Sequence, residues 1–438
     1  MICEMRLSDA AIRFGGTLLN PDCMFSTVAI DSRKTEYGDL FVALIGERLD
    51  AHDFLYQVAD KACGLVVSTA DKSLPLPQWV VPDTTVALGQ LALLQREQYS
   101  GVVVAITGST GKTSVKEMVA SIFASCGSVH ATKGNFNNHV GVPLTFLAME
   151  GNTDFAVIEM GANHQQEIAG YCQYAQPTHG LITNIGKAHL EGFGGEEGVF
   201  KGKKELYDFL HAHGAILFAN TELEKLKRAT QGMDPIEYGF NGKAFQLRIL
   251  SESPTLTFEY TSPTMQREIV TQLAGSYNLY NIASAIQIGL TFGVMEKEIL
   301  EAIQSYVPDN NRSQLKQTDR NTLIMDAYNA NPTSVEHALR SLAQQKNPHK
   351  MFILGDMLEL GDASEREHDA IILLTEQLGL TGYFVGPIFS SICHRRGIQS
   401  FPDTAAARVF FSEQLISDFL ILLKGSRGIQ LEAVMDCL

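Results

Sequence analysis

The most constraining feature of the chain is a short glycine-rich segment, residues 107–113 (TGSTGKT). It directly follows the apolar run 102–106 and precedes a stretch with helical spacing. In such a loop the glycines let backbone N–H groups turn toward an anion, the next helix presents its positive N-terminus, and the lysine neutralises phosphate charge. The sequence therefore predicts a nucleotide-binding loop rather than a surface turn. The usual spacing has a further glycine where this chain has Ile106, so a shortened loop variant is predicted.

Composition excludes several classes of protein. With 438 residues the chain is too long for one compact core, and two to four domains are expected. The 34 basic and 49 acidic residues leave a net charge of −15, which argues against nucleic acid as the partner. The first residues lack the apolar stretch of a signal peptide, and the late apolar run 419–423 is too short to span a membrane. Seven cysteines without CxxC or zinc spacing favour free thiols, so we expect a cytoplasmic protein.

Turn signals divide the chain into three expected α/β domains. Residues 1–84 contain short apolar runs separated by polar turns, which indicates a small α/β domain. Residues 85–308 alternate β-type runs with helical stretches, which is typical of a parallel sheet with helices on both faces. After a polar turn at 307–311 the strand–helix alternation resumes, so residues 309–438 are predicted to form a third α/β domain.

Polar side chains follow successive strands of the expected central sheet. Glu159 comes directly after the run 155–158, and His189 lies in the segment 183–191 that follows the next strand. Open α/β sheets gather ligands at the carboxyl ends of their strands. Glu159 is therefore a candidate Mg²⁺ ligand, and His189 a candidate ligand of a second metal ion or of substrate. The alternatives, a helix-capping acid and an ordinary polar histidine, stay open at this point.

Residues 201–206 (KGKKEL) bring three lysines close together in sequence. The simpler interpretation is the solvated start of a basic helix. In the alternative, neighbouring ammonium groups lower the proton affinity of one lysine, whose neutral amine can react with CO₂ to form an anionic carbamate that holds Mg²⁺. The residues alone leave both interpretations open.

Further polar segments are candidates for ligand recognition. Residues 135–143 (NFNNHVGVP) concentrate hydrogen-bonding side chains in a short loop, although an asparagine-rich turn is the simpler interpretation. In the expected third domain, residues 326–332 (DAYNANP), 355–361 (GDMLELG) and 424–428 (KGSRG) each follow an apolar strand. Three polar strand exits in one domain indicate a ligand-binding edge that faces the central domain.

Together these motifs resemble the Mur ligases over nearly the whole chain. That family uses a compact phosphate loop, so Ile106 supports the resemblance. The other matching segments are 31–33, 38–44 and 52–54 in the first domain and NFNNHVGVP, EMGAN, ITNIGKAHLEGFG and GSYNLYNIASAI in the second. DAYNANP and GDMLELG resemble the members that add D-alanyl-D-alanine, rather than those that add alanine, glutamate or a diamino acid.

The resemblance implies an ATP-dependent amide ligase. Such an enzyme joins UDP-N-acetylmuramoyl-tripeptide to D-alanyl-D-alanine through an acyl phosphate, in cytoplasmic peptidoglycan precursor synthesis. The implied architecture is a uridine-nucleotide-binding N-terminal domain, a central P-loop ATPase domain and a Rossmann-like C-terminal domain, in an expected monomer that does not span a membrane. A folylpolyglutamate-type or diamino-acid-adding ligase, a P-loop kinase and a non-catalytic nucleotide-binding homologue stay open as alternatives.

The resemblance also implies roles for individual residues. The expected catalytic residues are Lys112, Glu159, His189 and Lys203. Two Mg²⁺ ions would be held by Thr113, Glu159, His189 and Lys203, the last as N6-carboxylysine. ATP would be bound by Gly108, Ser109, Thr110, Gly111, Lys112, Thr113, Asn278, Asn281, Arg312 and Asp326. The other substrates would be bound by Ser32, Arg33, Asn137, Asn138, Tyr328, Asn329 and Asn331. The family often has arginine and histidine before the first of its adenine-site asparagines; this chain has Ser276 and Tyr277 there, and the aromatic Tyr277 is a candidate for stacking on the base.

Overall fold

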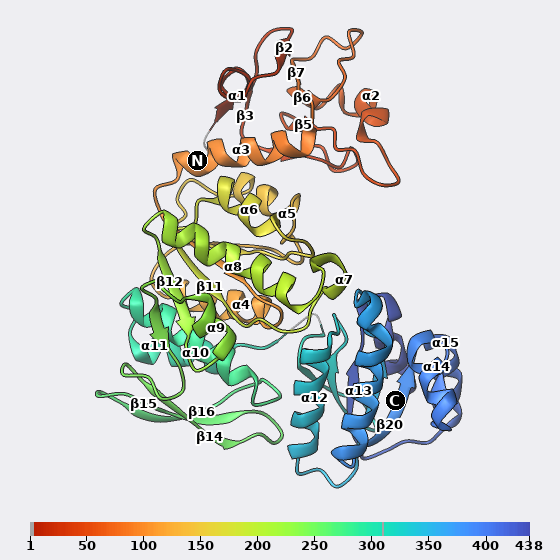
Figure 1. Ribbon diagram of the computed structural model, residues 1–438. Coiled ribbons are helices and arrows are strands. Elements are labelled where there is room, and N and C mark those ends of the chain that lie inside the picture. Colours follow the sequence, from red (N-terminus) through yellow and green to blue (C-terminus); the bar gives the residue numbers. More distant parts are fainter. Residues whose placement is uncertain (1–3, 309–310) are drawn as a thin grey trace.

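The computed structural model describes residues 4–308 and 311–438. Figure 1 shows three successive parts of the chain: the first at the top, the second in the middle and the third at the lower right. Each is built around its own largely parallel sheet, which confirms the predicted α/β class. No helix among the described residues is long and apolar enough to cross a membrane.

The first part contains a five-stranded sheet. The two strands at one edge of this sheet are antiparallel to each other, and the other neighbouring strands are parallel. The helices are α1 (Leu7–Phe14) and α2 (Leu55–Val58), and a two-stranded ribbon joins β1 (Met5–Arg6) to β3 (Met24–Phe25). In spatial order the sheet is β2 (Thr17–Leu19), β7 (Gln78–Val80), β6 (Gly64–Val67), β5 (Leu40–Val42) and β4 (Val28–Ala29).

A long helix, α3 (Thr84–Gln98), follows this sheet and packs against the second part of the chain. It begins at Thr84, because the side chain of Asp83 accepts hydrogen bonds from the backbone of Thr85 and Val86. Its contacts are with α5 (Gly141–Leu147) and α6 (Glu167–Ala175). The helix therefore connects the first sheet to the central one.

The central sheet has six parallel strands. Alternate residues of β8 (Val102–Thr107) face opposite sides of the sheet. Val103 and Ala105 pack with α3, α5, α6 and α8 (Glu196–Ala212). Val104 and Ile106 pack beneath α4. α4 (Lys112–Phe123), α10 (Asn278–Thr291) and α11 (Glu296–Ser305) cover this second face. The spatial order is β13 (Ile236–Tyr238), β12 (Ile216–Asn220), β11 (His179–Ile182), β8 (Val102–Thr107), β10 (Phe155–Glu159) and β9 (Val129–Ala131). Helices on both faces confirm the predicted pattern.

One element of the second part was not predicted. Instead of continuing the parallel alternation, β14 (Gln246–Ser251), β15 (Thr257–Thr261) and β16 (Gln266–Val270) form an antiparallel sheet. In β15 the side chains of Phe258 and Tyr260 are buried and their neighbours are not, which is the period of two expected when one face of a sheet covers a core.

The third part contains a second six-stranded sheet, parallel except for its first strand, β17, which is antiparallel to β18. The spatial order is β17 (Gln314–Gln317), β18 (Thr322–Asp326), β22 (Leu420–Lys424), β19 (Lys350–Gly355), β20 (Thr381–Val385) and β21 (Ser400–Phe401). Its helices are α12 (Pro332–Gln344), α13 (Ser364–Gln377), α14 (Pro387–Arg396) and α15 (Thr404–Glu413). The predicted boundary after residue 308 adjoins residues 309 and 310, which lie outside the described residues, and both domain boundaries stay predictions.

Candidate active site

The carboxyl ends of the central and C-terminal sheets meet at one cavity of about 800 Å³. This volume lies in the range of small-molecule sites. Most of the residues assigned to ATP and substrates line it: Ser109, Thr110, Gly111, Lys112, Asn137, Asn138, Glu159, His189, Asn278, Asn281, Arg312, Asp326, Tyr328, Asn329 and Asn331. Tertiary structure thus brings together residues that are far apart in sequence.

The glycine-rich loop has the backbone that a phosphate site requires. Gly108 and Gly111 have φ values of 146° and 78°, which favour glycine, and α4 starts immediately afterwards at Lys112. A Cβ atom on Gly111 would lie 2.2 Å from the side-chain oxygen of Asn281, so the loop and α10 approach each other closely. The Lys112 ammonium donates a hydrogen bond to the Gly108 carbonyl oxygen over 2.7 Å, and burial lowers the pKa of Lys112.

Glu159 is the last residue of β10, and only 1% of its surface is exposed. Its Oε1 atom accepts a hydrogen bond of 2.7 Å from the Asn137 amide, and its backbone N–H donates to Thr132. Its Oε2 atom is buried without a hydrogen-bond partner among the described residues. Asn138, by contrast, accepts from the backbone N–H groups of Val140 and Gly141, as the turn interpretation predicted.

His189 and Lys203 have different surroundings. His189 lines the cavity, and its Nδ1 atom contacts the carboxylate of Glu359 in the C-terminal part, a contact that the sequence did not predict. Lys203 lies behind the cavity wall on α8, where its Nζ atom donates to the carbonyl oxygen of Ala162, which lines the cavity, over 3.2 Å. Its side chain is buried, at 1% exposure.

The pKa of Lys203 lies well below the ordinary value, and the cause differs from the one expected. Burial makes the largest contribution and the positive charge of Lys112 adds to it, while Glu167 and Glu205 oppose the shift. The other two lysines of the run lie on different sides of α8. Lys201 is exposed, and Lys204 forms an ion pair with Asp208. The expectation that neighbouring lysines in the run lower this pKa is therefore corrected.

The start of α10 lies at another side of the cavity. Asn278 and Asn281 are joined by a side-chain hydrogen bond of 3.0 Å. The ring of Tyr277 stacks on His337 of α12, with centroids 5.8 Å apart and planes inclined by 22°. The Tyr277 hydroxyl lies 2.6 Å from the hydroxyl of Ser313.

The C-terminal part contributes charged and aromatic groups. The Arg312 guanidinium lies 3.7 Å from the centre of the Tyr328 ring, and Arg427 lies 5.6 Å from the same ring. Asp326 forms an ion pair with the buried Lys424. Asn331 serves the fold, because its side chain accepts from the backbone of Ser334 and caps α12.

Known proteins match this chain in sequence over almost its whole length. Family models match the Mur ligase middle domain at residues 106–289 and the Mur ligase glutamate ligase domain at residues 311–427. UDP-N-acetylmuramoyl-tripeptide–D-alanyl-D-alanine ligase of Escherichia coli K12 is 34% identical, over 99% of this chain and 98% of its own length. The chain belongs to the Mur ligase family.

Solved structures of the family share the whole architecture. A crystal structure of MurF from Acinetobacter baumannii matches with a TM-score of 0.89 and 31% identity, over 99% of this chain and 98% of the other. MurF ligase from Thermotoga maritima in complex with ADP matches with a TM-score of 0.82 over 94% and 96% of the two chains. At 24% identity the second likeness supports the fold alone. The three-part arrangement is thus that of a Mur ligase.

Two buried oxygen atoms, one at the end of the phosphate loop and one at the end of β10, suit a divalent cation. Thr113 Oγ1, at the start of α4, and Glu159 Oε2 are buried without hydrogen-bond partners in residues 4–308 and 311–438. Mg²⁺ takes a few protein oxygen ligands and completes its shell with water and substrate phosphates. The same described residues contain no group of three or more His, Cys, Asp or Glu side chains that could hold a metal ion. A cation here would therefore depend on phosphate oxygens as well.

Some predicted residues lie outside the cavity, and some lining residues were not predicted. Ser32 and Arg33 do not line it; Arg33 pairs with Asp31 on the exposed surface of the first part. Lys424 and His337 line it without having been assigned a role. Lys424 could have been found from its strand exit, since KGSRG was recognised as polar, but its pairing with Asp326 depends on β18 and β22 being neighbours.

Proposed function

We propose that the chain joins UDP-N-acetylmuramoyl-tripeptide to D-alanyl-D-alanine at the expense of ATP. The observation that carries this function is the shared cavity, in which Lys112 and Glu159 of the central part face Tyr328 and Asn329 of the DAYNANP segment. A ligase needs its nucleotide and its amine donor within reach of one carboxylate. The name of the relative from Escherichia coli states this activity, and the match covers 98% of that relative's length.

The chemistry proceeds through an activated carboxylate. The terminal carboxylate oxygen of the tripeptide attacks the γ-phosphorus of ATP, the bond to ADP breaks, and an acyl phosphate forms. The amine of D-alanyl-D-alanine then attacks the acyl carbon, its nitrogen gives up a proton to water, and the tetrahedral intermediate loses phosphate to leave an amide. Lys112 and the N-terminus of α4 stabilise negative charge on the transferring phosphoryl group.

We propose that Thr113, Glu159, His189 and Lys203 hold Mg²⁺ in this reaction. The bound cation neutralises phosphate charge. Lys203 has a chemical reason to be modified, because a lowered pKa increases the share of the neutral amine, which is the form that reacts with CO₂. A bond forms between Nζ and the carbon of CO₂, a proton leaves to water, and the product is an anionic carbamate. Mass spectrometry under native conditions and ¹³C NMR in labelled bicarbonate would detect it.

We further propose that adenine stacks on Tyr277. The ring lines the same cavity as Asn278 and Asn281, which the Mur ligase resemblance implies as adenine-site residues. His337 supports the other side of the ring from α12. Stacking on an aromatic face suits adenine, because each base offers a flat π surface.

The uridine part of the substrate is assigned to the first domain, residues 1–84, with Ser32 and Arg33. Arg33 is exposed, and two of its guanidinium nitrogens bind the carboxylate of Asp31, the same two-point geometry by which a guanidinium group binds a phosphate. We propose residues 85–308 and 309–438 as the other two domains, in a monomer, because the cavity is assembled within one chain. A cytoplasmic location agrees with the six described cysteines, all of which are free thiols.

Phosphate release tests this function. The purified protein is given ATP, Mg²⁺ and UDP-muramoyl-tripeptide ending in lysine or in diaminopimelate, with D-alanyl-D-alanine, D-glutamate or lysine in separate reactions. We expect stimulation by D-alanyl-D-alanine alone. Equal stimulation by all three amines would refute the assigned amine donor, and no release in any reaction would favour a non-catalytic homologue.

A further inference from the structure

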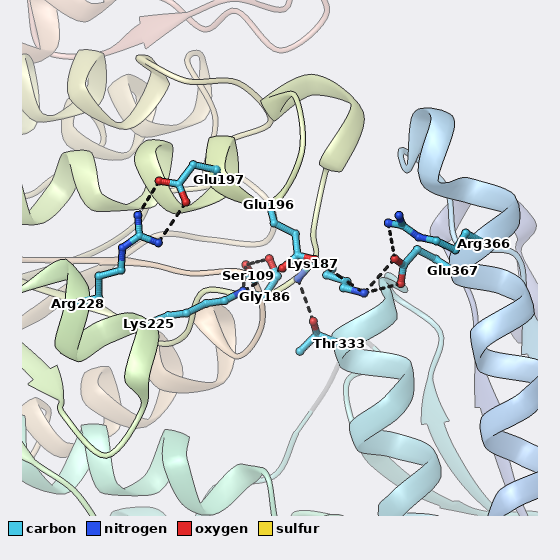
Figure 2. Close-up of polar contacts among 10 residues, drawn as sticks. All are labelled: Ser109, Gly186, Lys187, Glu196, Glu197, Lys225, Arg228, Thr333, Arg366 and Glu367. Carbon is cyan, nitrogen blue, oxygen red and sulfur yellow. Dashed lines mark hydrogen bonds and ion pairs between the residues drawn. The ribbon is translucent and has the colours of Figure 1, made fainter.

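A single residue of the central part, Lys187, contacts two helices of the C-terminal part. Its backbone N–H donates to the Thr333 hydroxyl of α12 over 2.9 Å. Its ammonium group lies 2.9 Å from both carboxylate oxygens of Glu367 on α13. Figure 2 shows both contacts, which reach across the gap between the two ribbons. Lys187 follows β11 in the loop that leads to α7 (Leu190–Phe193).

The Glu367 carboxylate depends on this contact. Its side chain is only 4% exposed, whereas that of Lys187 is 35% exposed. Arg366 also reaches Glu367, but it is 74% exposed and meets one oxygen at 3.0 Å. Glu196, the other carboxylate near Lys187, lies 3.9 Å away. A buried carboxylate that loses its main cationic partner is disfavoured, so Lys187 stabilises the docked arrangement of α13.

The same loop is bonded to the phosphate loop. The Ser109 hydroxyl accepts from the backbone N–H of Gly186 over 2.9 Å and donates to the Gly186 carbonyl oxygen over 3.2 Å. The Ser109 backbone N–H donates to the carbonyl oxygen of Asn184 over 3.0 Å. A Cβ atom on Gly186 would lie only 2.7 Å from the Thr333 hydroxyl oxygen. The peptide between Gly186 and Lys187 is therefore held between Ser109 and α12 (Figure 2).

A second set of contacts extends this interface. His189 pairs with Glu359, and the backbone N–H of Glu191 donates to the Glu359 carbonyl oxygen over 3.2 Å. Glu359 precedes the short helix η2 (Gly361–Ala363), which contacts α7. The loop after β11 thus contacts the C-terminal part along several residues, and Lys187 supplies its most buried ion pair.

We propose that Lys187 is a positioning residue for the ligase reaction. By binding Thr333 and Glu367 it docks the C-terminal domain against the loop that holds Ser109, so the placement of the amine donor is coupled to the placement of the ATP phosphates. The kinetic part of this inference rests on the proposed function. Reacting atoms must be about 3–3.5 Å apart, and a misplacement of about 1 Å can reduce the rate about a hundredfold.

The matched variants are Lys187→Met and Lys225→Met. Both remove an ammonium group near Glu196, which Lys225 contacts at 3.2 Å. Lys225 has no hydrogen bond or ion pair with residues 311–438. We expect Lys187→Met to lower kcat about tenfold or more, with a smaller change in the KM for ATP, because Lys112 and the glycine loop are intact. Lys225→Met should match the unchanged protein. Lys187→Arg should recover most of the loss, since it keeps the charge.

Hydrogen–deuterium exchange of the protein without substrates tests the docking directly. In Lys187→Met and in Glu367→Gln, backbone amides should exchange faster on both sides of the interface, in residues 184–191 and 332–340, while the first sheet is unchanged. Unaltered exchange at the interface, or a uniform increase in all three parts, would overturn the docking role. This measurement remains decisive even if no ligase activity is found. If the exchange changes as expected but Lys187→Met has the same kcat as Lys225→Met, the proposed coupling to catalysis is wrong.

Discussion

Asp326 and Lys424 lie opposite each other on the neighbouring parallel strands β18 and β22, and their charged groups are 2.6 Å apart. Lys424 is 2% exposed and also donates to the carbonyl oxygen of Asn329. The pair holds Asp326, an assigned ATP residue, at the edge of the cavity.

Removing the Lys424 charge should destabilise the protein. We expect Lys424→Met to lower the free energy of unfolding by about 3 kcal/mol, because it leaves a largely buried carboxylate unpaired. The double variant Lys424→Met, Asp326→Leu should regain most of that stability but not the turnover. Urea unfolding and phosphate release measure the two quantities. Recovery of full turnover in the double variant would exclude Asp326 from the ATP site.

Lys112 should be essential for turnover. Lys112→Ala is expected to reduce kcat about a hundredfold or more, by analogy with the removal of one preorganised donor to developing charge. Lys243→Ala removes an exposed lysine from the same part of the chain and is the control. Near-normal turnover of Lys112→Ala in the phosphate-release assay would contradict the role assigned to it.

Lys203 should make stability depend on pH. Burial lowers its pKa, so at pH values between the folded and the unfolded pKa the unfolded chain binds a proton that the folded protein does not. Stability therefore rises as the pH approaches the unfolded value of about 10.4, by at most about 1.4 kcal/mol per pH unit. Urea unfolding in CO₂-free buffer between pH 7 and 10 should show this slope, and Lys203→Met should lack it. Equal slopes for the two proteins would show that Lys203 is not buried as a neutral amine.

Tyr277 should contribute to ATP affinity through its ring. Tyr277→Ala is expected to raise the KM for ATP about tenfold or more, since a stacked base contributes about 1–3 kcal/mol. Tyr277→Phe keeps the ring and loses only the hydroxyl contact with Ser313, so its KM should stay close to the original. If Tyr280→Ala, which alters another aromatic residue of the cavity, raised the KM while Tyr277→Ala did not, the stacking ring would be the wrong one.

Much of the fold was predictable because its signals are local. The apolar runs and the glycines of the phosphate loop act over a few residues, and each forms the element that its pattern indicates. The antiparallel sheet β14 to β16 was missed even though β15 alternates, since the surrounding strand–helix pattern dominated the interpretation.

The candidate site was predictable where polar residues end a strand. Glu159 and Asp326 are the last residues of β10 and β18, as the runs before them indicated. The surroundings of His189 and Lys203 were not predictable, because their partners Glu359 and Ala162 come from other segments.

By itself the sequence determined which residues are available to bind phosphate and where along the chain the strands that precede them lie. Both depend on short-range backbone preferences. Tertiary structure alone decided that Lys203 is buried near Lys112, that Lys424 neutralises Asp326, and that Lys187 docks against Glu367. Burial and charge pairing are properties of groups brought together across the chain. They follow from the pairing of strands within a sheet and from the packing of the parts of the chain against one another, not from the spacing of residues along one segment.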